Sequence, residues 1–136
     1  MSTSASMEIE YRAEQDLLSV RWLSDLSLPQ MQAEYEALLV LESARRTVRW
    51  LLDIRQCPIP TIESANWVTL NWLPRAAALM APAHLCVAYI ISSERAEALA
   101  TDPDLAATVQ DALAPNRHYH LGLFRQEEEA VRWLLD

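Results

Sequence analysis

The stretch Val48-Arg49-Trp50-Leu51-Leu52-Asp53-Ile54 decides the fold. It is apolar on both of the faces that a strand would present, except at Arg49 and Asp53. Such a run is typical of an interior strand in a sheet that is covered on both sides. We therefore expect Trp50 and its neighbours in the middle of a sheet, with Asp53 at its rim.

Two strand patterns and one helix pattern precede this stretch. Residues 7–12 alternate between apolar and polar side chains, and a second alternating run covers residues 17–23 after a few polar residues. The two runs predict an antiparallel hairpin. Ser27 and Gln30 then have the spacing of a capping box, which predicts the start of a helix.

Helix and strand patterns alternate after the central stretch. A second helix is predicted from Thr61 to about Met80, bent at Pro74 because proline lacks a backbone donor. The later predicted elements are a strand over Leu85–Ile91, a short helix capped by Ser92 or Ser93, a helix from Asp102-Pro103 to Leu113, a strand over His118–Phe124 and a helix over Gln126–Leu135. This β-β-α-β-α-β-α-β-α order predicts an α/β fold, with a mixed five-stranded sheet flanked by helices. Residues 7–136 form one predicted domain, and residues 1–6 are expected to be disordered.

The composition excludes several classes of partner. The 136-residue chain has a formal net charge of −8, and its densest basic stretch is Arg45-Arg46 with Arg49, so neither nucleic acid nor an anionic membrane surface is expected as a partner. No apolar stretch approaches the ~20 residues of a membrane span. The start of the chain lacks a secretory pattern, and Cys57 and Cys86 are too few for a disulfide framework. A cytoplasmic protein is expected.

No catalytic or cofactor-binding constellation is evident in the sequence. The lone Gly122 excludes glycine-rich phosphate loops and dinucleotide fingerprints. His118 and His120 share a strand face, but they would need a third ligand to hold a metal, and His84 is the one other histidine. We therefore expect a non-catalytic protein with no cofactor and no metal. A weaker alternative is an enzyme that pairs Asp53 with a histidine.

Two local features accompany the order of elements: a third strand that ends in Asp53, and the closing run Phe124-Arg-Gln-Glu-Glu-Glu-Ala130-Val-Arg-Trp133-Leu134. With them, residues 7–136 resemble the STAS domain, the fold of the SpoIIAA-like anti-sigma-factor antagonists. In antagonist members the third strand ends in Asp-Ser/Thr-Ser-Gly, and a kinase partner phosphorylates the second hydroxyl residue. Here Asp53 carries over, whereas Arg55 and Gln56 stand at the serine and glycine positions. The resemblance thus implies a binding scaffold that lacks this phosphorylation switch.

The loop after the third predicted strand is the best candidate for a binding surface. Asp53, Arg55 and Glu63 surround it, and ligands of open α/β sheets favour the carboxyl ends of the strands. Asp53 would accept hydrogen bonds from a partner or ligand there. The alternative is that Asp53 only satisfies loop amides and pairs with Arg55.

Trp67 and Leu70 form a candidate protein interface on the second helix. Trp67 lies outside the main apolar stripe of that helix, and an exposed aromatic residue with apolar neighbours can anchor an interface. The alternative is that a neighbouring loop covers Trp67.

These patterns favour two functions. The first is a non-catalytic interaction or regulatory module with an unidentified protein partner, self-associating as a homodimer through the second helix. The second is a carrier of a small apolar molecule, with a pocket between the sheet and the second or third helix. The number of aromatic residues and the predicted bend at Pro74 motivate the carrier.

Overall fold

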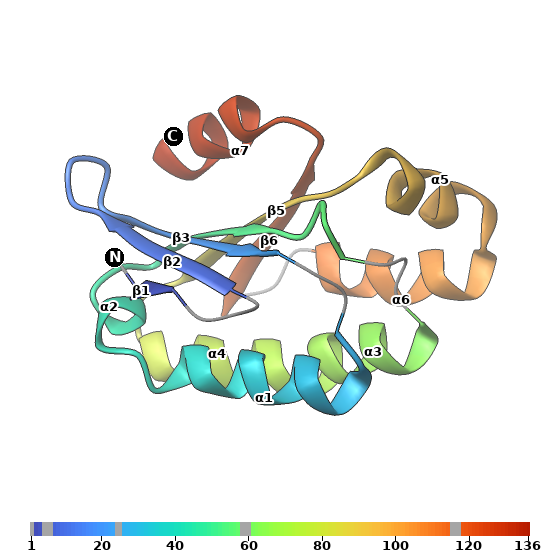
Figure 1. The fold of residues 1–136 in the computed structure, drawn as a ribbon, viewed down its shortest axis with the longest axis horizontal. Coiled ribbons are helices and arrows are strands. Elements are labelled where there is room, and N and C mark those ends of the chain that lie inside the picture. Colours follow the sequence, from blue (N-terminus) through green and yellow to red (C-terminus); the bar gives the residue numbers. More distant parts are fainter. Residues whose placement is uncertain (1, 4–6, 24–25, 58–60, 115–117) are drawn as a thin grey trace.

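The computed structural model of the protein describes residues 2–3, 7–23, 26–57, 61–114 and 118–136. Within these residues the chain forms one six-stranded sheet with helices on both faces (Figure 1). The strands are β1 (Ser2–Thr3), β2 (Met7–Arg12), β3 (Leu17–Trp22), β4 (Arg49–Asp53), β5 (Leu85–Ile90) and β6 (Tyr119–Phe124). The helices are α1 (Leu28–Leu39), α2 (Glu42–Arg45), α3 (Ile62–Trp67), the π-helical turn η1 (Val68–Trp72), α4 (Leu73–Met80), α5 (Ser93–Thr101), α6 (Pro103–Leu113) and α7 (Glu127–Leu135).

The strands lie in the sheet in the order in which they occur in the chain. β1, β2 and β3 are antiparallel neighbours, and β3 to β6 are parallel. The predicted α/β fold is confirmed, and the five predicted strands are β2 to β6. Ser2–Thr3 pairs with β2 as a short edge strand, so the expectation of a disordered start is wrong for these two residues. Met1 and residues 4–6 lie outside the described residues.

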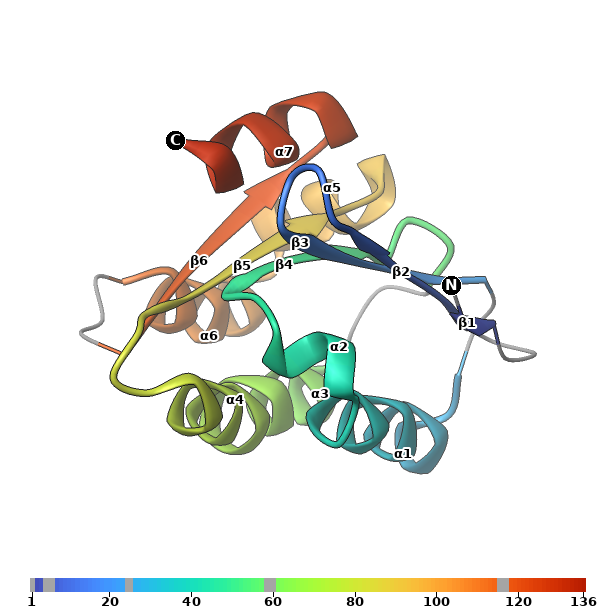
Figure 2. The same cartoon turned by 90° about the vertical axis from the view of Figure 1, so that its left-hand side faces the viewer.

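The strand order explains why the helices divide unequally between the two faces. From β3 to β6, each parallel strand lies next to the previous one in the same direction across the sheet. Because crossover connections of this kind are right-handed, their helices lie on the same face of the sheet. α1, α3, α4 and α6 form a layer under one face, and α7 covers the other (Figure 2). Among the described helices, none has the length and apolar character needed to cross a membrane.

The central strand β4 is the predicted interior strand. It lies between β3 and β5, and Trp50, Leu51 and Leu52 are at most 1% exposed. Trp50 and Leu52 belong to the core beneath the helix layer, whereas Leu51 packs in the smaller core under α7. Asp53 ends the strand, as expected.

The predicted helix starts are confirmed. The Oγ of Ser27 accepts from the Gln30 backbone N–H at 3.3 Å, and the Gln30 side chain accepts from the Ser27 backbone N–H at 3.0 Å. Thr61, Ser92 and Asp102 likewise accept hydrogen bonds from backbone N–H groups in the first turns of α3, α5 and α6. These caps satisfy donors that have no partner within the helix.

The second predicted helix runs through α3, η1 and α4. The π-helical turn η1 ends one residue before α4, and Pro74 is the second residue of α4. In a π turn the backbone bonds residues five apart, so side chains at this spacing come to lie on the same face. Trp67 and Trp72 have this spacing.

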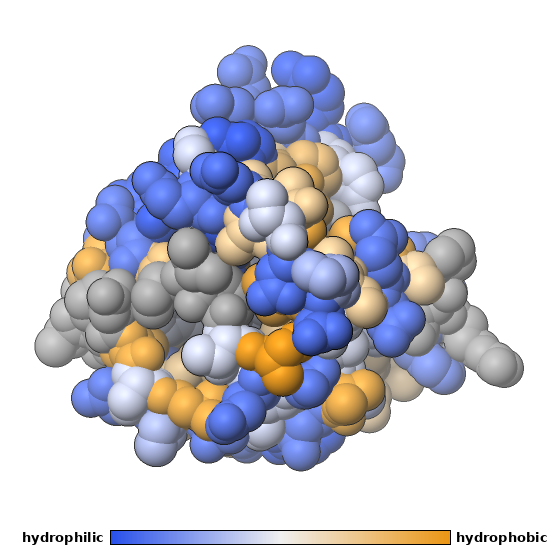
Figure 3. All heavy atoms as spheres, turned by 90° about the vertical axis from the view of Figure 1, so that its right-hand side faces the viewer, coloured by the Kyte–Doolittle hydropathy of each residue, from blue (hydrophilic) through white to orange (hydrophobic). Residues whose placement is uncertain are grey.

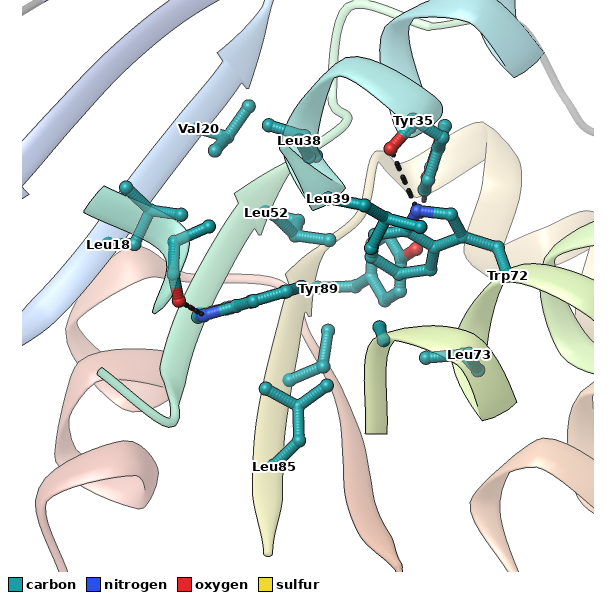
Figure 4. Packing of buried hydrophobic residues seen from close by; sticks show 14 of the residues in the cluster. Leu18, Val20, Tyr35, Leu38, Leu39, Leu52, Trp72, Leu73, Leu85 and Tyr89 are labelled. Carbon is teal, nitrogen blue, oxygen red and sulfur yellow. Dashed lines mark hydrogen bonds between the residues drawn. The ribbon is translucent and has the colours of Figure 1, made fainter. Parts of the chain in front are cut away.

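The core beneath the helix layer is rich in aromatic residues. Trp22, Trp50 and Trp72 are at most 1% exposed. Figure 4 shows the Trp72 indole donating to the Tyr35 backbone carbonyl of α1, at 2.8 Å. The same tyrosine donates to or accepts from the Tyr89 hydroxyl of β5 at 2.9 Å. These two bonds connect α1 to both η1 and the sheet.

Gly122 marks a close approach in the smaller core. A Cβ there would lie 2.7 Å from the Phe124 ring and 3.4 Å from Trp133. The Phe124 and Trp133 rings pack with centroids 5.5 Å apart, so Phe124 cannot move without disturbing the contact with α7. We expect Gly122→Ala to lower the free energy of unfolding by about 1–3 kcal/mol, measured by urea denaturation.

The control is Ala107→Ser at an exposed position of α6, which should change the free energy of unfolding by less than about 0.5 kcal/mol. A Gly122→Ala variant as stable as the wild type would contradict this account of the position.

Candidate functional site

The carboxyl ends of the parallel strands carry two features, one on each face of the sheet. A charge cluster lies on the face that α7 covers, and an apolar pocket lies on the face of the helix layer. Figure 3 looks onto this edge of the molecule, where apolar residues reach the surface among hydrophilic ones. Strand ends of this kind are the usual ligand sites of open α/β sheets.

Asp53 is the centre of the charge cluster, which comprises Arg21, Asp53 and Arg55. Arg55 donates to Asp53 from its backbone N–H at 3.1 Å, from Nε at 3.1 Å and from Nη2 at 2.7 Å. The Nε of Arg21 lies 3.4 Å from Oδ2 of Asp53. Two guanidinium groups therefore share one carboxylate.

The sheet register assembles this cluster. Arg21 in β3 is the direct neighbour of Asp53 in β4. Leu17 and Leu51 pack in the core under α7, and side chains two residues apart in a strand share a face. Arg21 and Asp53 therefore lie on the α7 side, where Arg55 joins them from the following loop.

The environment of Asp53 keeps its carboxyl group ionised. Burial raises its pKa, but the hydrogen bonds from Arg55 and the charges of Arg55 and Arg21 outweigh burial, so the pKa is lowered from 3.8. This geometry is the alternative considered from the sequence, in which Asp53 satisfies a loop amide and pairs with Arg55. Its carboxylate is already occupied by donors of its own chain.

The other predicted binding residues lie in the helix layer, away from this cluster. Glu63 is exposed in the first turn of α3, and Leu70 in η1 is 74% exposed. Trp67 was expected outside the apolar stripe of the second helix as an exposed interface anchor, and the structure corrects the expected exposure. Trp67 is partly buried, and its ring meets the Tyr35 ring edge-on with centroids 5.9 Å apart. The π turn causes this, because it brings Trp67 to the same face as Trp72, which also contacts Tyr35.

The histidines lie at the opposite end of the sheet from Asp53. His120 is beside Cys86, and Asp53 is beside Ile90, four residues further along β5, which is about 13 Å at the rise of a strand. His84 and His118 directly precede β5 and β6. The pairing of Asp53 with a histidine is therefore not formed.

The histidine end also offers no complete metal site among the described residues. The rings of His84 and His120 have centroids 5.5 Å apart, but no group of three His, Cys, Asp or Glu side chains is placed to hold an ion there or elsewhere in the described ranges.

The apolar pocket has a volume of about 220 Å³ and is partly open to solvent. It lies between the sheet and the surrounding helices, and its walls come from strands β3, β5 and β6 and from helices α1, α3, η1, α4, α5 and α6. Its described lining residues are Trp22, Leu26, Leu28, Met31, Tyr35, Ile54, Cys57, Thr61, Ser64, Ala65, Val68, Thr69, Leu73, Tyr89, Ile91, Arg95, Leu99, Val109, Ala112, Leu121 and Leu123.

A few polar groups interrupt this apolar wall. The hydrogen-bonded hydroxyls of Tyr35 and Tyr89 are buried, and burial raises the pKa of Tyr35 to about 12 and that of Tyr89 well above 10. Both tyrosines therefore stay neutral at physiological pH. Arg95 in the first turn of α5 is the one residue with a formal charge among the described residues of the lining. An apolar cavity with a few placed polar groups is the usual form of a small-molecule site.

Sequence reasoning identified Asp53 and Arg55 but missed Arg21, Tyr89 and Arg95. Arg21 could not be predicted as a neighbour of Asp53, because the sequence of either strand alone does not determine the register in which β3 pairs with β4. Arg95 could have been noticed in the sequence. A cation in the first turn of a helix interacts unfavourably with the helix dipole, which suggests that the residue has a role other than stabilising the helix.

Comparisons of the chain with protein-family models, with curated proteins and with solved structures found no significant match. The class of the protein is therefore defined by its own geometry: an α/β protein with a pocket beneath the carboxyl ends of its parallel strands.

Replacing the central carboxylate should destabilise the protein in a pH-dependent way. We expect Asp53→Asn to lower the free energy of unfolding by about 1–2 kcal/mol near neutral pH, a modest value because both arginines are more than one-third exposed. The folded pKa lies below the unfolded value of about 3.9. The stabilisation is thus fully present above about pH 4, and it is lost as the pH falls through the folded pKa. Urea denaturation of both proteins across this range measures it.

Glu42→Gln is the control, because Glu42 forms an exposed pair with Arg46 one helical turn away, worth less than about 0.5 kcal/mol. A stability difference for Asp53→Asn that persists unchanged at low pH would contradict the assignment.

Proposed function

We propose that this protein binds a compact, largely apolar small molecule in the pocket between the sheet and the helix layer. The observation that carries the proposal is the pocket itself, about 220 Å³ in volume and lined mainly by apolar side chains. This develops the carrier hypothesis that the aromatic residues and Pro74 motivated.

The volume of the pocket supports ligand binding. Protein interiors are close-packed, and voids larger than a water molecule are few. An engineered apolar cavity of about 150 Å³ holds benzene, whereas sites for drug-sized ligands begin at about 300 Å³. The pocket at about 220 Å³ therefore fits a ligand with one ring or a short branched chain.

The position of the pocket also supports the proposal. Trp22, Ile54 and Ile91 bring it to the ends of three neighbouring parallel strands. Val68 and Thr69 of the π-helical turn form part of the opposite wall. Ligand sites favour such strand ends, and π turns are frequent at functional sites.

Hydrocinnamyl alcohol is a suitable neutral probe, since it combines one ring with a short chain. We expect it to raise the melting temperature of the wild type in a concentration-dependent way, because a ligand that binds only the folded state stabilises it. Ala65 lines the pocket from α3. Ala65→Leu should fill part of the cavity and remove most of this stabilisation, as measured by differential scanning calorimetry.

The matched control is Ala78→Leu, which makes the same change at an exposed position of α4 outside the pocket. It should respond to the alcohol as the wild type does. Equal stabilisation of the Ala65→Leu variant would show that the probe binds elsewhere and would refute the proposal.

A second candidate is a protein-interaction or regulatory module, as the resemblance to the STAS domain implies. The charge cluster favours it, because Arg21 and Arg55 are 49% and 38% exposed and share a single carboxylate. These exposed guanidinium groups would suit acidic groups on a partner surface, although the charge of Glu127 also acts on Arg55. A homodimer through the second helix and a cytoplasmic location stay predictions. In such a dimer the exposed Leu70 would replace Trp67 as the anchor.

If the protein is such a module, the binding of its partner should depend on Arg21. Affinity purification of the tagged chain should recover a partner with the wild type and much less of it with Arg21→Gln, because Arg55 still holds Asp53 in that variant. Arg132→Gln removes the same charge from an exposed position of α7 and should have no effect. Equal recovery with Arg21→Gln, or no partner with the wild type, would count against the module.

A further inference from the structure

Residues on three walls of the pocket carry hydrogen-bond donors. They are the indole N–H of Trp22 at the end of β3, the hydroxyl pair of Tyr35 and Tyr89, and the guanidinium of Arg95 in α5. The hydroxyls of Thr61 and Ser64, in contrast, are engaged with each other and with the backbone at the start of α3.

The Trp22 indole is the most informative of these donors. Its Nε1 is buried and has no hydrogen-bond partner among the described residues. The indoles of Trp50 and Trp72 show the usual arrangement, since each donates to a backbone carbonyl. A buried donor without an acceptor is costly, and the Trp22 ring lines the pocket. An acceptor on a bound ligand would satisfy it.

The tyrosine pair adds a second donor. Two hydroxyl groups carry two protons, and the bond between Tyr35 and Tyr89 uses one of them. Burial keeps both hydroxyls protonated, because it raises both pKa values. One proton of the pair is thus left for another acceptor.

Arg95 gives the pocket its charge. Its positive charge acts to lower the pKa values of Tyr35 and Tyr89, an effect smaller than that of burial, which places the guanidinium near the tyrosine pair. The described lining of the pocket contains no Asp or Glu. Burial lowers the pKa of Arg95, as expected for a cation with little solvent around it. A guanidinium group binds carboxylates through charge-assisted hydrogen bonds, often two at once.

We propose that the ligand is a compact carboxylate with an apolar body, whose carboxylate accepts hydrogen bonds from Arg95 and from the tyrosine hydroxyls. The apolar body occupies the remainder of the cavity, and an acceptor of the ligand satisfies the Trp22 indole. This inference rests on the proposed ligand-binding function and adds the chemical class of the ligand. The mainly apolar wall excludes an inorganic anion as the preferred occupant, since such an ion would leave that wall unfilled.

The test compares three probes of nearly equal shape by isothermal titration calorimetry on the full chain: hydrocinnamate, hydrocinnamyl alcohol and phenylpropylamine. We expect hydrocinnamate to bind the wild type about tenfold or more tightly than the alcohol, because a charge-assisted hydrogen bond is stronger than a neutral one. The amine should bind more weakly than the alcohol, because its cation would face Arg95.

Variants assign the preference to the proposed groups. Arg95→Gln should bring hydrocinnamate and the alcohol to similar affinities, and Arg95→Lys should keep part of the preference. Trp22→Phe should weaken hydrocinnamate by severalfold while the stack on Tyr35 is retained. Arg132→Gln on the opposite face of the sheet is the charge-matched control and should leave all affinities unchanged.

The outcomes separate the two proposals. If the alcohol binds the wild type as tightly as hydrocinnamate, or if the preference survives Arg95→Gln, the carboxylate assignment is overturned while ligand binding stands. If none of the three probes binds, both the carboxylate assignment and the proposed ligand-binding function are refuted. The comparison of probes on the wild type decides the assignment even if Arg95→Gln does not fold.

Discussion

The hydrogen bond between Tyr35 and Tyr89 holds the helix layer at a fixed distance from the sheet. It joins α1 to β5 at 2.9 Å inside the core. Tyr35 also stacks on Trp22 with centroids 5.0 Å apart and meets Trp72 edge-on at 4.7 Å. Such aromatic pairs contribute about 0.5–1.5 kcal/mol each beyond their burial, and a buried hydrogen bond contributes a similar amount. Rigid rings fixed in this way act as spacers, so the neighbouring side chains cannot close the pocket by simple collapse.

The order of the strands gives the protein two faces, each with a candidate site, and these faces share one short segment. Ile54 lines the pocket on the helix side, and Asp53 and Arg55 belong to the charge cluster on the α7 side. A shift of the backbone around Ile54 would therefore change the geometry of the bonds that Arg55 makes with Asp53. Because Ile54 lies between Asp53 and Arg55 in the chain, a ligand in the pocket would be able to alter the surface that the charge cluster forms. The two candidate functions are therefore compatible with one another.

The features that the sequence predicted well have local causes. The run from Val48 to Ile54 and the capping box at Ser27 are visible in a few adjacent residues, and both are found as expected. The pocket residues are different, because Tyr35 and Tyr89 are 54 positions apart and meet only through the packing of α1 on β5. The exposure of Trp67 was predicted incorrectly for a different reason. The spacing rule of an α-helix puts it away from Trp72, whereas the π turn between them brings both rings to Tyr35.

The position of Trp22 favours a ligand over a permanently dry core. A phenylalanine would supply the same apolar surface and the same stack on Tyr35 without bringing a donor into the interior. The indole costs stability as long as its N–H has no acceptor, and the described residues supply none. The other two buried indoles of this core have carbonyl partners at 3.1 Å or less, so the fold is able to satisfy such groups where the chain alone must do so. The residue that carries the unsatisfied donor instead lines the apolar pocket, so we expect a ligand there to supply the missing acceptor.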